Sequence, residues 1–339
     1  MPLWIKLCSP LVLMCLSGCA TYIADKITDY KPAPISGDLA TLTQPKTICA
    51  DSGHCIEALA LAHSPSDVTS SLKYDIKVKD NHKIWRYVHT GKESVKPTSL
   101  AKPMAIIFPG YGQPNLILTI MATWLHLESG ADVFIIESAD NSEHFQFGLD
   151  TVAPIISVIN REKPSKVQLI GFSMGAVAAH AVAQQVDNAE LHLVAPMTNF
   201  EQSALGLWNV LKHDSIFSAL ISEETMKEAV GLVHERAKLS AQDIDIKLTA
   251  HDSATPAYIY VSHDDTVTPA KNWQGMQSNT WQLNKYQGLN HMEMVTLLRN
   301  DLFLSFAANL LGKEPDSHDI TTFGLMCDAD NAECLNQKL

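Results

Sequence analysis

A serine stands between two glycines at residues 171–175, in the run Gly-Phe-Ser-Met-Gly. The apolar residues 166–170 predict a short buried strand before it, and residues 177–186 after it are good helix formers. A sharp strand-to-helix turn of this kind needs outer positions that are nearly free of side chain, and it lifts the serine oxygen into the open. The pattern favours Ser173 as a nucleophile over a serine in an ordinary glycine-flanked turn.

A serine nucleophile needs a base that takes its proton and an acid that orients the base. Two further buried strands are predicted at residues 257–261 and 280–286, and polar residues follow each of them. Asp264 and Asp265 come after the first strand, and His291 comes after the second. Because open α/β sheets build their sites at the carboxyl ends of their strands, we expect an acid and a base at the same edge as the serine.

With a serine, an acid and a histidine in this order, the chain resembles the α/β-hydrolase family over residues 73–311. The family often has its acid in the frame Gly-x-x-Asp-x-x-Val-Pro, and residues 262–269 match it with Ser for Gly and Thr for Val. The frame implies Asp265, rather than its neighbour, as the acid. The resemblance implies His291 as the base, whereas His263 beside the acid is better explained as an exposed or hydrogen-bonding residue.

The loop after another buried strand, at residues 105–108, supplies the fourth piece of such a site. This strand ends in Pro-Gly-Tyr-Gly, and a helix is predicted after it at residues 114–129. The resemblance implies that the backbone N–H groups of Tyr111 and Met174 hold the oxyanion. The family commonly has His-Gly in this loop, and Pro109 replaces that His. The alternative is a strand-to-helix turn with no catalytic part.

The expected fold class is α/β, an α/β-hydrolase fold with an eight-stranded, mostly parallel sheet and helices on both faces. The first two strands are expected as a hairpin that turns at Asp80-Asn81. Helical stretches separate most of the later strands, as a right-handed parallel sheet requires. The predicted strands are residues 73–79, 83–89, 105–108, 132–137, 166–170, 191–195, 257–261 and 280–286.

Residues 198–256, after the sixth strand, are too many for a simple crossover and predict a helical cap. Its apolar side chains either line a pocket for an acyl chain or only hold the cap on the core, and the second role is the commoner one. They are Phe200, Leu207, Trp208, Leu211, Ile216, Phe217 and Leu220.

Residues 1–18 predict a secretory signal, with a weakly positive start and an apolar run too short to span a membrane. The run Leu-Ser-Gly-Cys at residues 16–19 resembles the bacterial lipobox, which implies that Cys19 becomes the lipid-bearing first residue of the mature protein. A plain signal peptide or a membrane anchor are the alternatives. Ala20 stands where an Asp would favour retention in the inner membrane, so we expect the outer membrane, on its periplasmic side.

Residues 19–72 are expected as a tether and an N-terminal extension, and residues 312–339 as a C-terminal extension. Residues 21–45 are interpreted as the link between the lipid and the domain. A protein that starts near Lys46 should then be soluble and fully active.

Four cysteines remain after Cys19, all outside the hydrolase region. An even number in an oxidising compartment suggests disulfides. Three pairings are possible, and the close spacings favour Cys49–Cys55 and Cys327–Cys334. A zinc site is disfavoured because neither pair has C-x-x-C spacing.

The net charge of −12, with no cluster of Lys and Arg, argues against nucleic-acid binding. A glycine-rich phosphate loop and metal-ligand spacings are absent from the sequence, so no cofactor and no metal are expected. The expected partners are a small-molecule or lipid acyl substrate and the membrane.

The resemblance implies a serine hydrolase that cleaves acyl compounds, with a carboxylic ester as the favoured substrate. The same triad also serves thioesters, amides and peptides. A catalytically silent hydrolase fold that binds a ligand in the cell envelope is the alternative from a different class.

Overall fold

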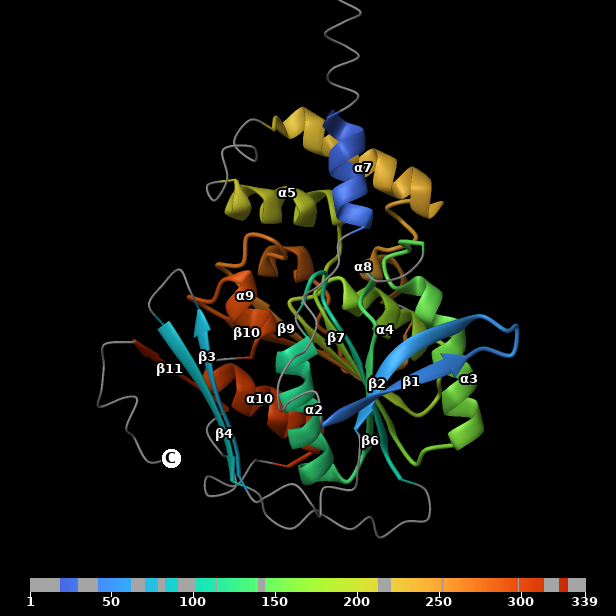
Figure 1. Cartoon of the computed structure of the whole chain (residues 1–339), viewed down its shortest axis with the longest axis vertical. Helices are drawn as coiled ribbons and strands as arrows, with labels where there is room; N and C mark the ends of the chain where they lie inside the picture. The colour runs from blue at the N-terminus through green and yellow to red at the C-terminus, as the bar shows by residue number, and fades with distance from the viewer. Residues whose placement is uncertain are drawn as a thin grey trace, which may run out of the picture.

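The structure is a computed structural model of the chain (Figure 1). It describes residues 19–29, 42–61, 71–78, 83–90, 102–113, 115–139, 144–212, 221–250, 253–297, 299–313 and 323–328.

An eight-stranded sheet forms the centre of the fold, in the order β1-β2-β6-β5-β7-β8-β9-β10. The six strands from β6 to β10 in this order run parallel, and β2 joins β6 antiparallel. The predicted eight-stranded, mostly parallel sheet is confirmed. The parallel strands are β5 (Met104–Phe108), β6 (Asp132–Ile136), β7 (Val167–Phe172), β8 (Ala189–Val194), β9 (Ala257–Ser262) and β10 (Trp281–Tyr286).

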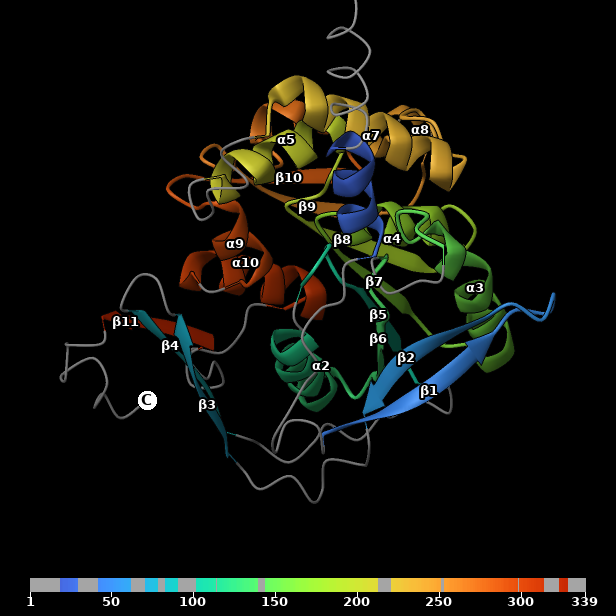
Figure 2. The ribbon, with the colours of Figure 1, turned by 45° about the horizontal axis from the view of Figure 1, so that its top comes forward.

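Helices cover both faces of this sheet, so its central strands are buried on both sides (Figure 2). In β5, Ile106 and Ile107 point to opposite faces because side chains alternate along a strand. One core lies under α3 (Val152–Glu162) and α4 (Gly175–Ala183). The other core lies under three helices, namely α2 (Asn115–Ser129), α9 (His291–Val295) and α10 (Asn300–Leu311).

The main sheet begins earlier in the chain than the sequence predicted. Its first hairpin is β1 (Thr43–Cys49) and β2 (Cys55–Leu61), which pair antiparallel from end to end. The residues of β1 are mostly polar and include Pro45, so the sequence places them in the expected N-terminal extension. Proline is tolerated in a strand at the edge of a sheet, which is where β1 lies. A disulfide joins Cys49 and Cys55 at the turn of this hairpin.

The hairpin predicted at residues 73–89 does form, but it is not part of the main sheet. Strands β3 (Ser71–Val78) and β4 (Lys83–Thr90) pair antiparallel, and β11 (Phe323–Asp328) adds to β4 in a separate three-stranded sheet. Placing this hairpin at the start of the main sheet was therefore wrong. Alternating side chains predict a half-buried strand, but they do not determine which sheet it joins. Cys334 lies outside the described residues, so a Cys327–Cys334 disulfide stays a prediction.

The insertion between β8 and β9 forms the predicted helical cap above the carboxyl ends of the strands (Figure 1). It contains α5 (Phe200–Leu211), α7 (Glu223–Ala237) and α8 (Ile246–Ala250). Phe200 is buried, with its ring 4.9 Å from that of Phe147 and 5.6 Å from that of His234. This residue therefore joins α5 to the core and to α7. Leu211 is exposed, Leu207 and Trp208 are half-buried, and Ile216, Phe217 and Leu220 lie outside the described residues.

Residues 19–28 form a helix that lies across α7 (Figures 1 and 2). Ala20, Ile23 and Ala24 are buried in the same core as the apolar face of α7. The expectation of a free tether from residue 21 onward is therefore wrong for this helix, because burial of its apolar face fixes it on the cap.

Residues 291–311 are long and apolar enough to cross a membrane, and they are the one such segment in the described part of the chain. About half of this segment is buried inside the fold as α9 and α10. That burial is typical of the core helices of a globular domain.

Candidate active site

Ser173 lies in the sharp turn between β7 and α4, with a backbone φ of 47°. This left-handed conformation is rare for any residue but glycine and is strained. A Cβ at Gly175 would lie 2.3 Å from the carbonyl oxygen of Phe108, and one at Gly171 would lie 2.6 Å from the Cα of Ala176. Only glycine fits at these two positions, so the geometry of the turn explains the Gly-x-Ser-x-Gly pattern.

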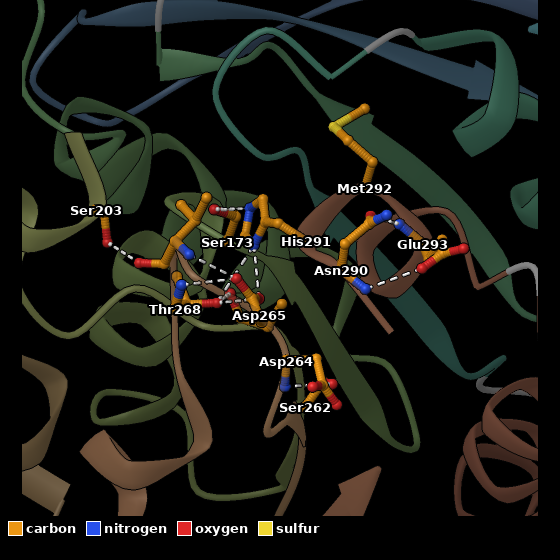
Figure 3. Close-up of polar contacts among 12 residues, drawn as sticks. Ser173, Ser203, Ser262, Asp264, Asp265, Thr268, Asn290, His291, Met292 and Glu293 are labelled. Atoms are coloured by element: carbon orange, nitrogen blue, oxygen red, sulfur yellow. Dashed lines mark hydrogen bonds and ion pairs between the residues drawn. The ribbon is translucent and has the colours of Figure 1, made fainter. Parts of the chain in front are cut away.

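The structure brings Ser173, His291 and Asp265 into one chain of hydrogen bonds (Figure 3). The Nε2 of His291 lies 3.0 Å from Oγ of Ser173, and its Nδ1 lies 2.8 Å from Oδ2 of Asp265. An ionised carboxylate only accepts hydrogen bonds, so Nδ1 carries the proton and Nε2 is left to accept from the serine hydroxyl. This is the tautomer that a general base for Ser173 requires.

The position of His291 is fixed by the start of α9, of which it is the first residue. Asn290 and Glu293 form a capping box, in which each side chain accepts a hydrogen bond from the other's backbone N–H. The imidazole therefore stands on a capped helix end, directly after the loop that follows β10.

Asp265 is buried, and both of its carboxylate oxygens are fully engaged. The N–H groups of Val267 and Thr268 donate to Oδ1 at 2.8 and 2.9 Å. The hydroxyl of Thr268 donates to Oδ2 at 2.7 Å, beside the bond from His291. Burial raises the pKa of Asp265, but the bond and charge of His291 and the bonds from Thr268 outweigh it, so the pKa lies below its usual value. The acid is therefore held in its charged form.

The neighbouring acid and histidine point elsewhere. Asp264 accepts a hydrogen bond from the N–H of Gly288 at 2.6 Å, which ties the acid loop to the loop that carries the base. His263 is exposed, and its backbone N–H donates to the carbonyl of Tyr286. Neither side chain enters the hydrogen-bond chain of the triad.

The loop after β5 lies directly against the nucleophile, because a Cβ at Gly110 would lie 3.2 Å from Cβ of Ser173. Gln113 is buried, accepts from the N–H of Gly110 at 2.8 Å and donates to the carbonyl of Val295 at 2.9 Å. The hydroxyl of Ser138 donates to the carbonyl of Gly110 at 3.1 Å. These bonds hold the backbone that carries Tyr111 beside the serine.

Met174 begins α4 as its N-cap. The first N–H groups of a helix have no acceptor within the helix and present positive partial charge. The loop that carries Tyr111 and the start of α4 therefore both adjoin Ser173. The oxyanion role of the Tyr111 and Met174 amides stays a prediction.

Thr268 and Gln113 were not identified from the sequence. Thr268 stands where the family frame has Val, and this departure from the frame could have indicated a role for the residue. In the structure its hydroxyl donates a hydrogen bond to the carboxylate of Asp265. Gln113 gave no signal, because its two partners are backbone groups 3 and 182 residues away.

Among the residues that the structure describes, no group of three or more His, Cys, Asp and Glu side chains is arranged to hold a metal ion. Cys19 is a free, exposed thiol at the start of the N-terminal helix.

No protein-family profile matches the chain, and no curated protein matches it. Solved structures do match. An esterase of Pyrococcus furiosus is 12% identical, with a TM-score of 0.52, and the match covers 83% of this chain and 97% of that one. A puromycin-hydrolyzing peptidase of Mycobacterium tuberculosis is 12% identical, with a TM-score of 0.50, over 86% of this chain and 44% of that one.

At these identities the similarity concerns the fold. This similarity of fold agrees with the strand order of the main sheet. It also agrees with the sharp turn after the fifth strand of that sheet and with the cap after its sixth strand. The chain has the α/β-hydrolase fold.

Proposed function

We propose that the protein is a serine hydrolase that cleaves an acyl compound, above all a carboxylic ester, through an acyl-enzyme on Ser173. The observation that carries the proposal is the unbroken hydrogen-bond chain from Asp265 through His291 to Ser173. Each of its links has the length of a hydrogen bond, and the acid that anchors it is buried and charged.

In this proposal, Nε2 of His291 takes the proton of Ser173 as Oγ attacks the carbonyl carbon of the substrate. The charge of Asp265 stabilises the imidazolium that results, and its bond to Nδ1 keeps the ring in place. The amides of Tyr111 and Met174 stabilise the oxyanion. His291 then gives the proton to the leaving alcohol, and a water molecule, activated by the same histidine, releases the acid from Ser173.

The ester is favoured over thioesters, amides and peptides, which the same triad can cleave. The structural neighbours include both an esterase and a peptidase, so their names do not separate these substrates. An ester needs less help to its leaving group than an amide or a peptide does, because an alcohol leaves more easily than an amine.

We further propose that the mature protein carries lipid on Cys19 and resides at the outer membrane, on its periplasmic side. The lipobox-like run before Cys19 supports this, as does the exposed position of its thiol. A disulfide between Cys49 and Cys55 fits an oxidising compartment.

A set of matched substrates with one acyl group tests the reaction. The purified protein is offered the ester, thioester and anilide of the same short acid, and Ser173→Ala is measured beside it. The proposal predicts turnover of the ester fastest, and a loss of about 10³-fold or more in the variant. Turnover that survives in Ser173→Ala would exclude this serine as the nucleophile. Hydrolysis of none of the three by the native protein would favour the silent binding protein.

A further inference from the structure

The N-terminal helix, residues 19–28, contacts the loop that carries the proposed oxyanion amide. The hydroxyl of Tyr111 donates to the carbonyl of Ile27 at 3.0 Å, and the carbonyl of Lys26 lies 3.5 Å away. The last carbonyls of a helix have no partner within the helix. The tyrosine therefore caps the end of this helix with its side chain, and the preceding residue of its loop, Gly110, adjoins Ser173.

The helix itself is fixed from its other sides. Ala24 is fully buried, and Ala20 and Ile23 are nearly so. The carboxylate of Asp25 lies 2.7 Å from the guanidinium of Arg236 on α7. This ion pair is partly exposed and is worth little alone, so the apolar face of the helix does most of the fixing. The carbonyl that Tyr111 contacts is consequently held on the cap.

The ring of Tyr111 continues this connection into the core. It meets Phe145 edge-on at 6.4 Å, and Phe145 meets Phe147 at 4.9 Å. Phe147 in turn packs on Phe200 of the cap. The side chain of Tyr111 is thus held at its hydroxyl by the N-terminal helix and along its ring by buried aromatic residues.

We propose that the helix of residues 19–28 is a positioning element of the active site, which acts through the side chain of Tyr111 on the backbone amide of that residue. The inference rests on the proposed function, in which this amide stabilises the oxyanion. Displacement of the helix lets the loop move, and amides that stabilise an oxyanion lose their effect when they are misplaced by less than an ångström.

A consequence concerns Cys19. An α-helix rises about 1.5 Å per residue, which puts Cys19 about 12 Å along the helix axis from Ile27. Lipid attached at Cys19 would therefore be joined to the active site by a packed helix instead of a flexible chain. Membrane attachment and the oxyanion loop would share one structural element.

Tyr111→Phe in the full chain is the direct test, because it removes one hydroxyl and keeps the ring and the backbone amide. The expected result is a fall of about tenfold in kcat on a short ester with little change in KM, less than the 10²–10³-fold that loss of a donor costs. Affinity for a trifluoromethyl ketone, which forms a tetrahedral adduct with the serine, should fall with kcat. Tyr22→Phe on the same helix is the matched control: this tyrosine is exposed, and its variant should behave as the native protein.

A double-variant cycle shows whether the helix is the partner. Ala24→Glu puts a charge at a fully buried position and displaces the helix without touching the site. It should lower kcat as Tyr111→Phe does, and the double variant should be no worse than Ala24→Glu alone. Losses that multiply would overturn the inference, as would a Tyr111→Phe protein with native kcat and native inhibitor affinity. Failure of the proposed function is distinguishable, since it would show as turnover that persists in Ser173→Ala or as no turnover by the native protein.

Discussion

Asp264 and Asp265 are neighbours in the chain but bind different loops through their carboxylates. Asp265 accepts from His291 at 2.8 Å, while Asp264 accepts from the N–H of Gly288 at 2.6 Å. The family frame favoured Asp265 from sequence, and the hydrogen bonds of the structure give the two acids separate roles, one at the base and one at the loop before it.

The first prediction follows from this division. Asp265→Asn should lower kcat by about 10³-fold or more, because an amide in place of the carboxylate favours the wrong tautomer of His291 and leaves an imidazolium unstabilised. Asp264→Asn should lower it far less, since it loses only a charge-assisted bond at an exposed loop. Steady-state kinetics on one short ester measure both. If Asp264→Asn proved the worse of the two, the assignment of the acid would be reversed.

A second prediction concerns the contact between the cap and the acid loop. Gly206 of α5 lies so close to this loop that a Cβ would be 2.4 Å from the carbonyl oxygen of Thr266, beside Asp265. Gly206→Ala should therefore displace the acid loop, lower kcat and cost about 1–3 kcal/mol of unfolding free energy.

Gly231→Ala in α7 is the matched control, because a Cβ there would meet nothing within 4 Å. A helical alanine without a clash should raise the unfolding free energy by up to about 1 kcal/mol and leave turnover intact. Equal behaviour of the two variants would mean that the cap does not press on the acid loop.

The third prediction is a pH dependence of stability. His180 of α4 is buried, contacts Thr249 of α8 at 2.8 Å, and has its pKa lowered by burial to about 4. Between pH 6.5 and 4 the unfolded chain binds a proton at this residue that the folded chain does not. The free energy of unfolding should therefore be unaffected by His180 above pH 6.5. As the pH falls from 6.5 towards 4, protonation of this residue in the unfolded chain should lower the free energy of unfolding by about 3 kcal/mol.

His180→Gln should flatten this part of the profile relative to the native protein. Denaturant unfolding at pH 7, 5.5 and 4 gives the comparison. His192 is fully buried and also has its pKa lowered by burial, so a residual slope of the same sign is expected in the variant. An unchanged slope in His180→Gln would show that this residue is protonated in the folded state.

The fourth prediction concerns the mature N-terminus. Cys19→Ala should block lipidation and leave an uncleaved or mislocalised protein, which mass spectrometry of the detergent-extracted protein detects. A protein that starts at Lys46 should lose activity as well as the anchor. Lys46 lies inside β1, so this cut removes the first residues of that strand together with the helix on the cap. Full activity of the shortened protein would return residues 19–45 to the role of a tether.

The triad was accessible from the sequence because each member follows a buried strand within a short local pattern. Ser173 lies in a turn that only flanking glycines permit, and Asp265 and His291 follow strands whose apolar runs are easily seen. The parallel order of these strands then places all three at one edge.

What the sequence did not reveal depends on partners far away in the chain. The polar strand β1 exists because β2 pairs with it, and of its own residues only Cys49, expected in a disulfide with Cys55, pointed to that partner. The helix of residues 19–28 had a usable signal, since Ala20, Ile23, Ala24 and Ile27 recur at helical spacing. The composition of the segments around it suggested a linker, and the surface of α7 that buries this face could not be predicted.

The central claim is that Ser173 is a nucleophile activated by His291 and Asp265, and a fluorophosphonate probe tests it most directly. The full chain is treated with the probe, digested and analysed by mass spectrometry to locate the adduct. The account predicts one adduct per chain, on Ser173, formed about 10³-fold more slowly or not at all in His291→Ala. An unlabelled Ser173 in the native protein, or an adduct on another serine, would contradict it.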